Sequence, residues 1–409
     1  MNTHGPRSTR GKDLQDFQDL PRAPELNFFR KHRLPRAARA PGARAREAFE
    51  TLNLFTSADG WRWIAEYFRH RFGRKHPFLA YGSDDNGIYP LRGDDGADDD
   101  AIRIAIGGDW ATGTDEAFAI AELMAKRKPH YSIHLGDVYF VGDPAETKEN
   151  FLGERNPRHS YTPCIWPKGS KGAFALSGNH EMYARGYAYF DLMLPTLGLI
   201  LEGKAQGQKA SFFCLENKYW RIIGLDTGYN SVGFPLLEYI FSPDCALPAQ
   251  IIDWLRNVLR QKEDRRGIVL LSHHQYYSRF DDWYVKPAEQ LAEFIDRPVL
   301  WLWGHEHRLT VHKKRQTGAG VVAYGRCVGH GGMPVELPPD QPKHAECEAE
   351  FVDRRLYRND EHLKVGVNGF AALAFKGKAL VIDYVDIEDK IIFSESWTIG
   401  DQGELARVS

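Results

Sequence analysis

The order of apolar and polar positions predicts strands that alternate with helices through the middle of the chain. Helical patterns cover residues 115–126 and 248–259. Short apolar runs that read as strands cover residues 101–106, 131–135, 173–176, 211–215, 220–225, 268–271 and 298–303. This alternation is typical of a layered α/β domain. Three further runs, at residues 370–375, 379–385 and 391–397, predict a strand meander near the C-terminus.

The first hundred residues differ from this pattern. Residues 1–46 are predicted to form a disordered basic tail, because 30–46 holds seven basic residues, no acidic residue and two prolines. The alternative is that this tail tethers the chain to nucleic acid or an anionic surface. Residues 47–100 are predicted to be a helical extension, with a helix at 57–72, followed by an acidic linker. The main domain is then expected at residues 101–400.

Composition adds few constraints. The 409 residues carry a net charge of -2, so no overall field selects a polyanionic partner. The five cysteines are far apart and lack a CxxC spacing, which argues against a disulfide framework and for a reducing compartment. We see no secretory signal and no apolar run of roughly 18 residues. A cytoplasmic protein without a transmembrane segment is therefore expected.

Polar residues of one chemical kind recur just past the carboxyl ends of five predicted strands. In a layered α/β fold, groups at the carboxyl ends of neighbouring strands converge in one crevice. Each position has a glycine or serine nearby, which allows the backbone to turn sharply. The side chains are those of Asp109, Asp137, Asn179, His273, His305 and His307.

Carboxylate and imidazole groups are suitable ligands for Zn, Mn and Fe. A carboxylate can also bridge two cations, and two cations about 4 Å apart can hold a phosphoryl oxygen and generate hydroxide. Each block alone is weak, because a Gly-Asp turn or a lone histidine is more often structural. Together, five blocks in this order indicate a two-metal site.

The blocks resemble those of the calcineurin-like metallophosphoesterase superfamily. They read Gly108-Asp109, Gly136-Asp137, Gly178-Asn179-His180-Glu181, His273-His274 and Gly304-His305-Glu306-His307. The resemblance covers roughly residues 101–310. It implies a four-layer α/β/β/α sandwich with an N-terminal extension and metals at one edge of the sheets.

The resemblance also implies roles for individual residues. Asp137 would bridge the two metals, and His180 would donate a proton to the leaving oxygen or stabilise the transition state. Asp109 and His307 would serve the first metal. The second metal would be held by Asn179, His273 and His305. In the pair His273-His274, His273 is preferred because it follows the strand as the single histidine does in relatives, and His274 is the alternative.

One departure concerns the first metal. Most of the superfamily has Asp-x-His in the first block, whereas this chain has Asp109-Trp110-Ala111. The purple acid phosphatase branch lacks the same histidine and uses a tyrosine three positions after the bridging aspartate. Here that position is Phe140, and Tyr139 comes one residue earlier. The first metal is therefore expected to have three protein ligands plus water, or to recruit Tyr139.

The resemblance implies metal-dependent hydrolysis of a small phosphorylated substrate, a monoester or a diester, by metal-bound hydroxide. The cofactors would be two divalent or trivalent ions, Mn, Fe or Zn. Arg308, which follows the last ligand, is a candidate substrate-binding residue, with a solvent-facing ion pair as the alternative. The alternative function is a catalytically weak or inactive metal-binding interaction protein of the same fold, which Ala111 favours and His180 opposes.

Overall fold

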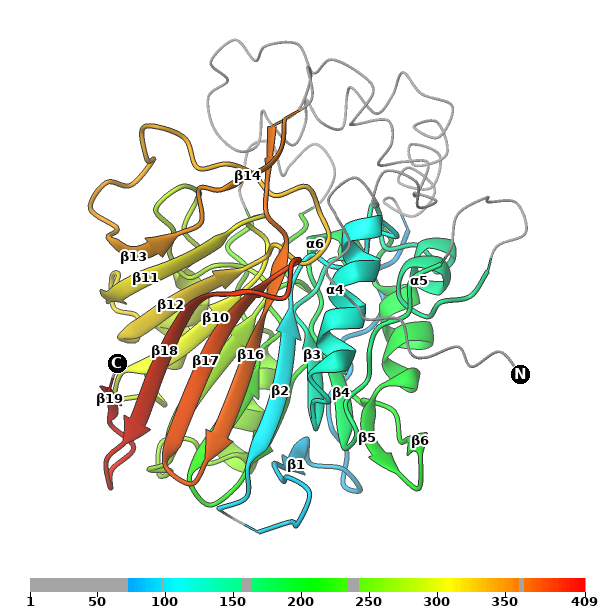
Figure 1. Ribbon diagram of the computed structural model, residues 1–409. Helices are drawn as coiled ribbons and strands as arrows, with labels where there is room; N and C mark the ends of the chain where they lie inside the picture. Colours follow the sequence, from blue (N-terminus) through cyan, green and yellow to red (C-terminus); the bar gives the residue numbers. More distant parts are fainter. Residues whose placement is uncertain (1–72, 98, 156–162, 234–242, 360–363, 409) are drawn as a thin grey trace, which may run out of the picture.

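The computed structural model describes residues 73–97, 99–155, 163–233, 243–359 and 364–408. The predicted basic tail and the predicted helix at 57–72 lie outside these ranges. Two large sheets pack face to face in the described part of the chain, and helices pack on the outer side of their parallel strands (Figure 1). No helix in these ranges is both long and apolar enough to cross a membrane.

The first sheet has nine strands, and its centre is parallel. β2, β3 and β4 run parallel, while the C-terminal strands β16, β17 and β18 add to β2 as an antiparallel meander. In spatial order the strands are β19 (Leu405–Arg407), β18 (Ile391–Ile399), β17 (Ala379–Asp386), β16 (Gly369–Lys376), β2 (Ile102–Gly107), β3 (Tyr131–His134), β4 (Gly172–Ala175), β5 (Gly198–Leu201) and β6 (Lys204–Ala205).

The second sheet has eight strands, and β8, β9, β10 and β12 are parallel neighbours. In spatial order its strands are β1 (Ile88–Pro90), β7 (Phe213–Glu216), β8 (Trp220–Gly224), β9 (Gly267–Ser272), β10 (Val299–Trp303), β12 (Ala323–Val328), β11 (Leu309–Arg315) and β13 (Ala349–Val352). A separate two-stranded ribbon joins β14 (Leu356–Asn359) and β15 (Lys364–Gly366).

The alternation of side chains along the strands explains why the sheets form the inner layers. Ile104 and Ile106 of β2 face the other sheet, whereas Ala105 faces the helical layer. Likewise Leu271 of β9 faces the first sheet and Leu270 faces outward, towards helices. Both faces are therefore apolar, as is usual for parallel strands covered on each side.

Helices form the two outer layers. The first sheet is covered by α4 (Asp115–Lys126), and the second by α7 (Ala249–Asp253), the π-helical turn η4 (Trp254–Val258) and α8 (Val285–Leu291). Thr114 caps α4 by accepting the amide of Ala117. The remaining helical elements are α5 (Pro144–Asn150), α6 (Asn179–Tyr183), the π-helical turn η2 (Tyr189–Met193) and the 3-10 turn η3 (Leu194–Thr196).

This arrangement confirms the predicted α/β sandwich, and the helix predicted at 248–259 is present with one irregularity. The helix predicted at 248–259 is not uniform, because Leu259 donates its amide to Trp254 five residues earlier and widens the helix. Trp254 and Leu255, at the start of this turn, are both buried in the core.

Candidate metal centre

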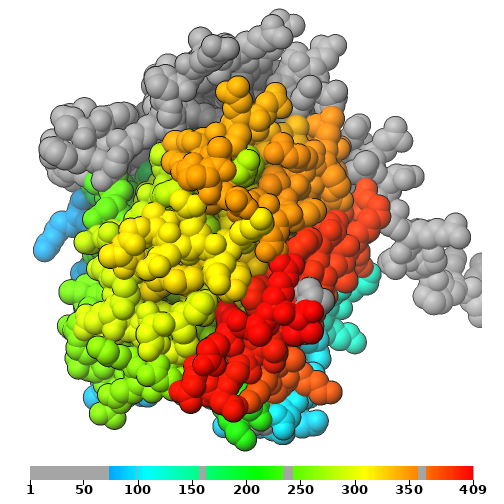
Figure 2. Space-filling model, turned by 90° about the vertical axis from the view of Figure 1, so that its left-hand side faces the viewer, coloured from blue at the N-terminus to red at the C-terminus, as the bar shows by residue number. Residues whose placement is uncertain are grey.

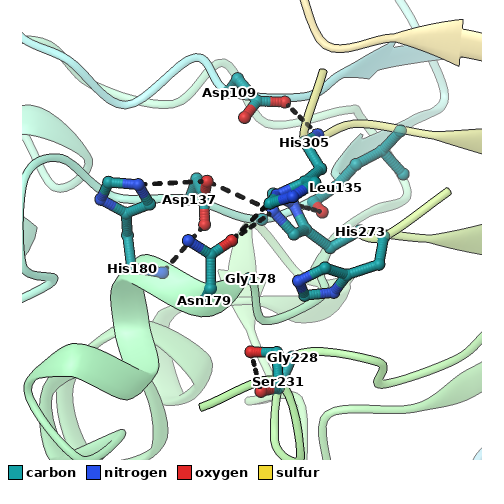
Figure 3. A network of polar contacts seen from close by, with 12 residues as sticks. Asp109, Leu135, Asp137, Gly178, Asn179, His180, Gly228, Ser231, His273 and His305 are labelled. Carbon is teal, nitrogen blue, oxygen red and sulfur yellow. Dashed lines mark hydrogen bonds and ion pairs between the residues drawn. The ribbon is translucent and has the colours of Figure 1, made fainter. Parts of the chain in front are cut away.

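The loops that carry the predicted ligands come together at one edge of the sandwich. Asp109, Asp137 and Asn179 follow β2, β3 and β4 of the first sheet, whereas His273 and His305 follow β9 and β10 of the second. Figure 3 shows these side chains facing one another. Because the strands of each set are parallel, their carboxyl ends lie at the same edge.

The loops can approach closely because glycines lie at their contacts. A side chain on Gly108 would bring its Cβ within 3.0 Å of the Cα of Gly304. A side chain on Gly178 would collide with the carboxylate of Asp137. In addition, Asp109, Asp137 and His305 have positive φ angles of 56°, 73° and 66°. Such left-handed backbone in a non-glycine residue is uncommon and concentrates at functional sites.

Asp137 lies at the centre of the cluster. Its Oδ2 is 3.2 Å from Nε2 of His273 and 3.1 Å from the hydroxyl oxygen of Tyr139. Its Oδ1 accepts the backbone amide of His180 at 3.1 Å. The carboxylate therefore lies between groups from both sheets, the position that a shared ligand requires.

One side of Asp137 is formed by Asp109, Tyr139 and His307, which we call the phenol half. The hydroxyl oxygen of Tyr139 is 2.7 Å from Oδ1 of Asp109 and 2.9 Å from Nε2 of His307. Nε2 of His307 is also 3.6 Å from Oδ1 of Asp109. The backbone of Ala111 pairs with the loop that carries Tyr139, since the Ala111 carbonyl accepts the amide of Tyr139 at 3.0 Å. The phenol of Tyr139 thus contacts all three predicted ligands of the first metal.

The other side of Asp137 is formed by Asn179, His273 and His305, which we call the amide half. Oδ1 of Asn179 is 3.2 Å from Nε2 of His273 and 3.0 Å from Nδ1 of His305. Nδ1 of His273 is 3.0 Å from the carbonyl oxygen of Leu135 and donates to it. That hydrogen bond fixes the tautomer and leaves Nε2 as the ligand atom.

His274, the alternative to His273, is buried next to the amide half. Its ring centroid is 4.6 Å from that of His305, and its Nδ1 is 3.1 Å from the Thr227 hydroxyl. His273, His274 and His305 can bring one ligand atom each within 4.8 Å of one another. His273 contacts both Asp137 and Asn179, which favours His273 as the ligand.

His180 and Glu181 follow Asn179 on α6. Nδ1 of His180 donates to the carbonyl oxygen of Phe140, and Nε2 is 3.8 Å from Oδ2 of Asp137. The carboxylate of Glu181 accepts the backbone amides of Gly178 and Asp137 at 2.8 Å and 3.2 Å. Glu181 therefore ties the α6 loop to the Asp137 loop, a role that the sequence motif alone did not reveal.

Burial and neighbouring ionisable groups strongly shift the pKa values of the carboxylates in and beside the cluster. Burial, together with the neighbouring Asp137, raises the pKa of Asp109 to about 8. Burial alone would raise the pKa of Asp137 too, but the adjacent His273 and His180 hold it well below its usual range. Burial and Asp137 raise the pKa of Glu181 to about 8. Buried carboxylates that repel one another in this way favour a bound cation.

The glycine-rich turn after β12 supports the Asp109 loop. Gly331 donates its amide to the carbonyl of Gly108, and Gly332 and Met333 donate theirs to the carbonyl of Asp109, at 3.0 to 3.1 Å. This turn follows a strand that the sequence pattern did not reveal. The turn helps to position Asp109 through these backbone hydrogen bonds.

Arg308 has a different environment from the candidate ligands. It is 3% exposed, donates to Glu336 at 2.8 Å and lies 3.7 Å from Glu306. Arg308 therefore forms an ion pair, but a buried one, so the solvent-facing ion pair that was the alternative is wrong. Substrate binding by Arg308 stays a prediction, without a contact to the cluster in support of it.

Comparisons with known proteins agree with this geometry. The family model described as calcineurin-like phosphoesterase matches residues 102–309. No curated protein matches the chain.

One similar solved structure is a Plasmodium protein described as GAP50, the anchor in the inner membrane complex. It is 15% identical, the match covers 74% of this chain and 90% of that chain, and the TM-score is 0.45. PhoD is 12% identical, and the match covers 76% of this chain and 72% of that chain with a TM-score of 0.43. The E. coli phosphoesterase Yfce is 11% identical, with 72% and 98% covered and a TM-score of 0.26. Likenesses this distant carry no conclusion about function.

Proposed function

This chain belongs to the calcineurin-like phosphoesterase family, and from that premise we propose that it hydrolyses a phosphate ester at the cluster around Asp137, with two bound metal ions. One observation carries the proposal. Oxygen and imidazole donors from both sheets surround a single buried carboxylate.

The donor set fits two cations that share Asp137. The phenol half offers Asp109, His307 and the phenol oxygen of Tyr139, while the amide half offers one amide oxygen and two imidazoles. Mixed oxygen and nitrogen donors suit Mn, Fe or Zn. Tyr139 takes the place of the missing histidine at position 111. Bound ions supply Lewis-acid polarisation of a phosphoryl oxygen and lower the pKa of water.

His180 is proposed to act on the leaving group. Its ring is held by the carbonyl of Phe140 and by Tyr139, whose ring centroid lies 4.3 Å away. Because Nδ1 donates to that carbonyl, a second proton on Nε2 is the one available for transfer to the leaving oxygen. No covalent intermediate on the protein is required.

The exposed edges of the cluster indicate where substrate approaches. The side chains of His180 and His307 are 17% and 19% exposed, whereas those of Asp137 and His273 are almost fully buried. A phosphorylated small molecule would therefore meet the cluster between His180 and His307. Phosphomonoesters and phosphodiesters are both candidate substrates. A cytoplasmic location and a role of the tail in binding nucleic acid or an anionic surface stay predictions.

A substrate panel tests the proposal. Metal-depleted protein is assayed with chromogenic phosphomonoesters and phosphodiesters, each with added Mn, Zn, Fe, Ni or Mg. We expect hydrolysis that requires metal and is lost in Asp137→Asn, a variant of matched size. Metal binding without turnover of any ester would favour the alternative, a weak or inactive metal-binding interaction protein, for which Ala111 remains the supporting observation.

A further inference from the structure

The first turn of α6 brings a tyrosine to the candidate ligand Asn179. Asn179 begins this helix and Tyr183 ends it four residues later, so the two side chains lie on the same helical face. Nδ2 of Asn179 donates to the Tyr183 hydroxyl at 3.0 Å. The opposite end of the amide, Oδ1, then lies 3.2 Å from Nε2 of His273 and 3.0 Å from Nδ1 of His305.

The orientation of this amide decides whether Asn179 can bind a cation. The oxygen end carries lone pairs, whereas the nitrogen end carries two hydrogens and has no lone pair to donate. The two ends have nearly the same shape, so packing alone discriminates poorly between them. With the oxygen directed at His273 and His305, the nitrogen end meets the Tyr183 hydroxyl, which accepts its hydrogen, so removal of the hydroxyl costs a hydrogen bond in the ligating orientation.

We propose that Tyr183 is a positioning residue that holds the Asn179 oxygen towards the metal of the amide half. The proposal rests on the proposed function, because it assumes a metal at Asp137, Asn179, His273 and His305. Tyr183 also lies edge-on to His180, with ring centroids 5.0 Å apart. One side chain therefore contacts both the candidate ligand and the candidate proton donor.

The Tyr183→Phe variant isolates the hydroxyl, since it keeps the ring beside His180. Metal-depleted protein is titrated with Mn²⁺ by calorimetry, and the amide-half site is identified as the one lost in Asn179→Ala. We expect Tyr183→Phe to weaken that site about tenfold, the scale of outer-shell partners of metal ligands, and to leave the phenol half unchanged. The activity lost at low Mn²⁺ should return at saturating Mn²⁺.

Tyr229→Phe is the matched control. Tyr229 is also half-buried, and its hydroxyl donates to the carbonyl of His76 at 2.7 Å, away from the cluster. This variant removes one hydroxyl of the same kind and should leave Mn²⁺ affinity unchanged.

The comparison of Tyr183→Phe with Tyr229→Phe separates positioning from general stability. Each variant removes one hydroxyl from a half-buried tyrosine, so a loss of general stability should lower the melting temperature in both. Only Tyr183→Phe should weaken Mn²⁺ binding. No loss of Mn²⁺ affinity in Tyr183→Phe, or an equal loss in Tyr229→Phe, would overturn the proposal.

The outcomes also separate this inference from the proposed function. A loss of Mn²⁺ affinity in Tyr183→Phe but not in Tyr229→Phe, without hydrolysis of any ester, would support the role of Tyr183 and reject the enzyme. Hydrolysis by the native protein without such a loss would reject the role of Tyr183 alone. A native protein that binds no Mn²⁺ at Asn179 would overturn both.

Discussion

The amide half and the phenol half of the candidate centre share Asp137 but are held in different ways. In the amide half, groups outside the cluster fix the donors: the Leu135 carbonyl holds His273, and the Tyr183 hydroxyl holds Asn179. The donors contact one another in both halves, but in the phenol half one of the donors, the Tyr139 hydroxyl, holds the others through its contacts with Asp109, Asp137 and His307.

This difference predicts unequal metal affinities. Ligands that are oriented by outside groups keep those outer hydrogen bonds when a cation replaces the contacts between the donors. In the phenol half, a cation has to replace the hydrogen bonds of the phenol, and burial together with Asp109 and Asp137 raises the pKa of Tyr139 well above its usual value. We therefore expect the amide half to bind more tightly. The predictions below run from the largest expected effect to the smallest.

Asp137→Ala removes the group that the two halves share. We expect both ions and all measurable hydrolysis to be lost, since a bridging carboxylate contacts both cations. Metal analysis and activity are measured on the same sample, with circular dichroism to verify folding. Full occupancy of both sites in this variant would exclude Asp137 as the bridge.

His180→Ala changes a residue that neither half needs as a ligand. Both ions should remain, while turnover falls about 100-fold, the scale of one general acid–base group. The loss should be larger for esters with poor leaving groups, which depend more on proton donation. Normal turnover of a poor leaving group would remove His180 from the mechanism.

Tyr139→Phe affects the phenol half alone. Loss of the phenol oxygen should weaken that ion about tenfold and leave the amide-half ion unchanged. A calorimetric titration with two resolved sites gives both affinities. If the two sites weaken equally, the hydroxyl acts through Asp137 rather than as a donor to one ion.

Ala111→His sharpens the same comparison. In the native background this substitution should change the metal affinity of the phenol half little, because Tyr139 already contacts Asp109, Asp137 and His307. In the Tyr139→Phe background the new imidazole should raise the metal affinity of the phenol half several-fold, since a neutral imidazole is a comparable donor. Ala111 is fully buried, so the melting temperature of each variant is measured first. Failure to restore affinity in a folded double variant would mean that position 111 does not face the ion.

Deletion of residues 1–46 should have the smallest effect. The tail holds no cluster of ligand-type residues and few apolar residues, so hydrolysis of a small chromogenic ester should be unchanged. The full chain is the control. A large loss of activity with the fold intact would show that the tail forms part of the pocket.

Sequence patterns predicted much of this fold where each strand has two apolar faces. The runs at 101–106, 268–271 and 298–303 correspond to β2, β9 and β10, because parallel strands buried on both sides are continuously apolar. β12 was missed because it contains Gly325 and Arg326. Arg326 is fully buried in a two-point ion pair with Glu395 of β18, at 2.7 Å for each bond.

That ion pair links the two sheets near their C-terminal strands. Figure 2 shows the segments around residues 300–330 in yellow and the C-terminal strands in red side by side on one face. A partner 69 residues away in the chain is what makes a buried arginine tolerable. A strand pattern describes one segment of the sequence at a time, so it does not reveal a pair formed between distant segments.

The candidate site shows the same limit. Motif spacing singled out Asp109, Asp137, Asn179 and the histidines, because strand ends converge in this kind of fold. The contacts of Tyr139 depend on how its loop pairs with Ala111, and spacing left that position open. The contact between Tyr183 and Asn179 has a simple signal, a spacing of four residues, but it appears only once the helix is known to begin at Asn179.

A metal count on the native protein tests the central claim most directly. Metal-depleted chain is titrated with Mn²⁺ and the bound ions are counted by mass spectrometry at saturation. Two ions per chain, with the tighter one lost in Asn179→Ala and both lost in Asp137→Ala, is the result predicted by a shared carboxylate between unequal halves. A single ion per chain at saturation would contradict the two-metal centre.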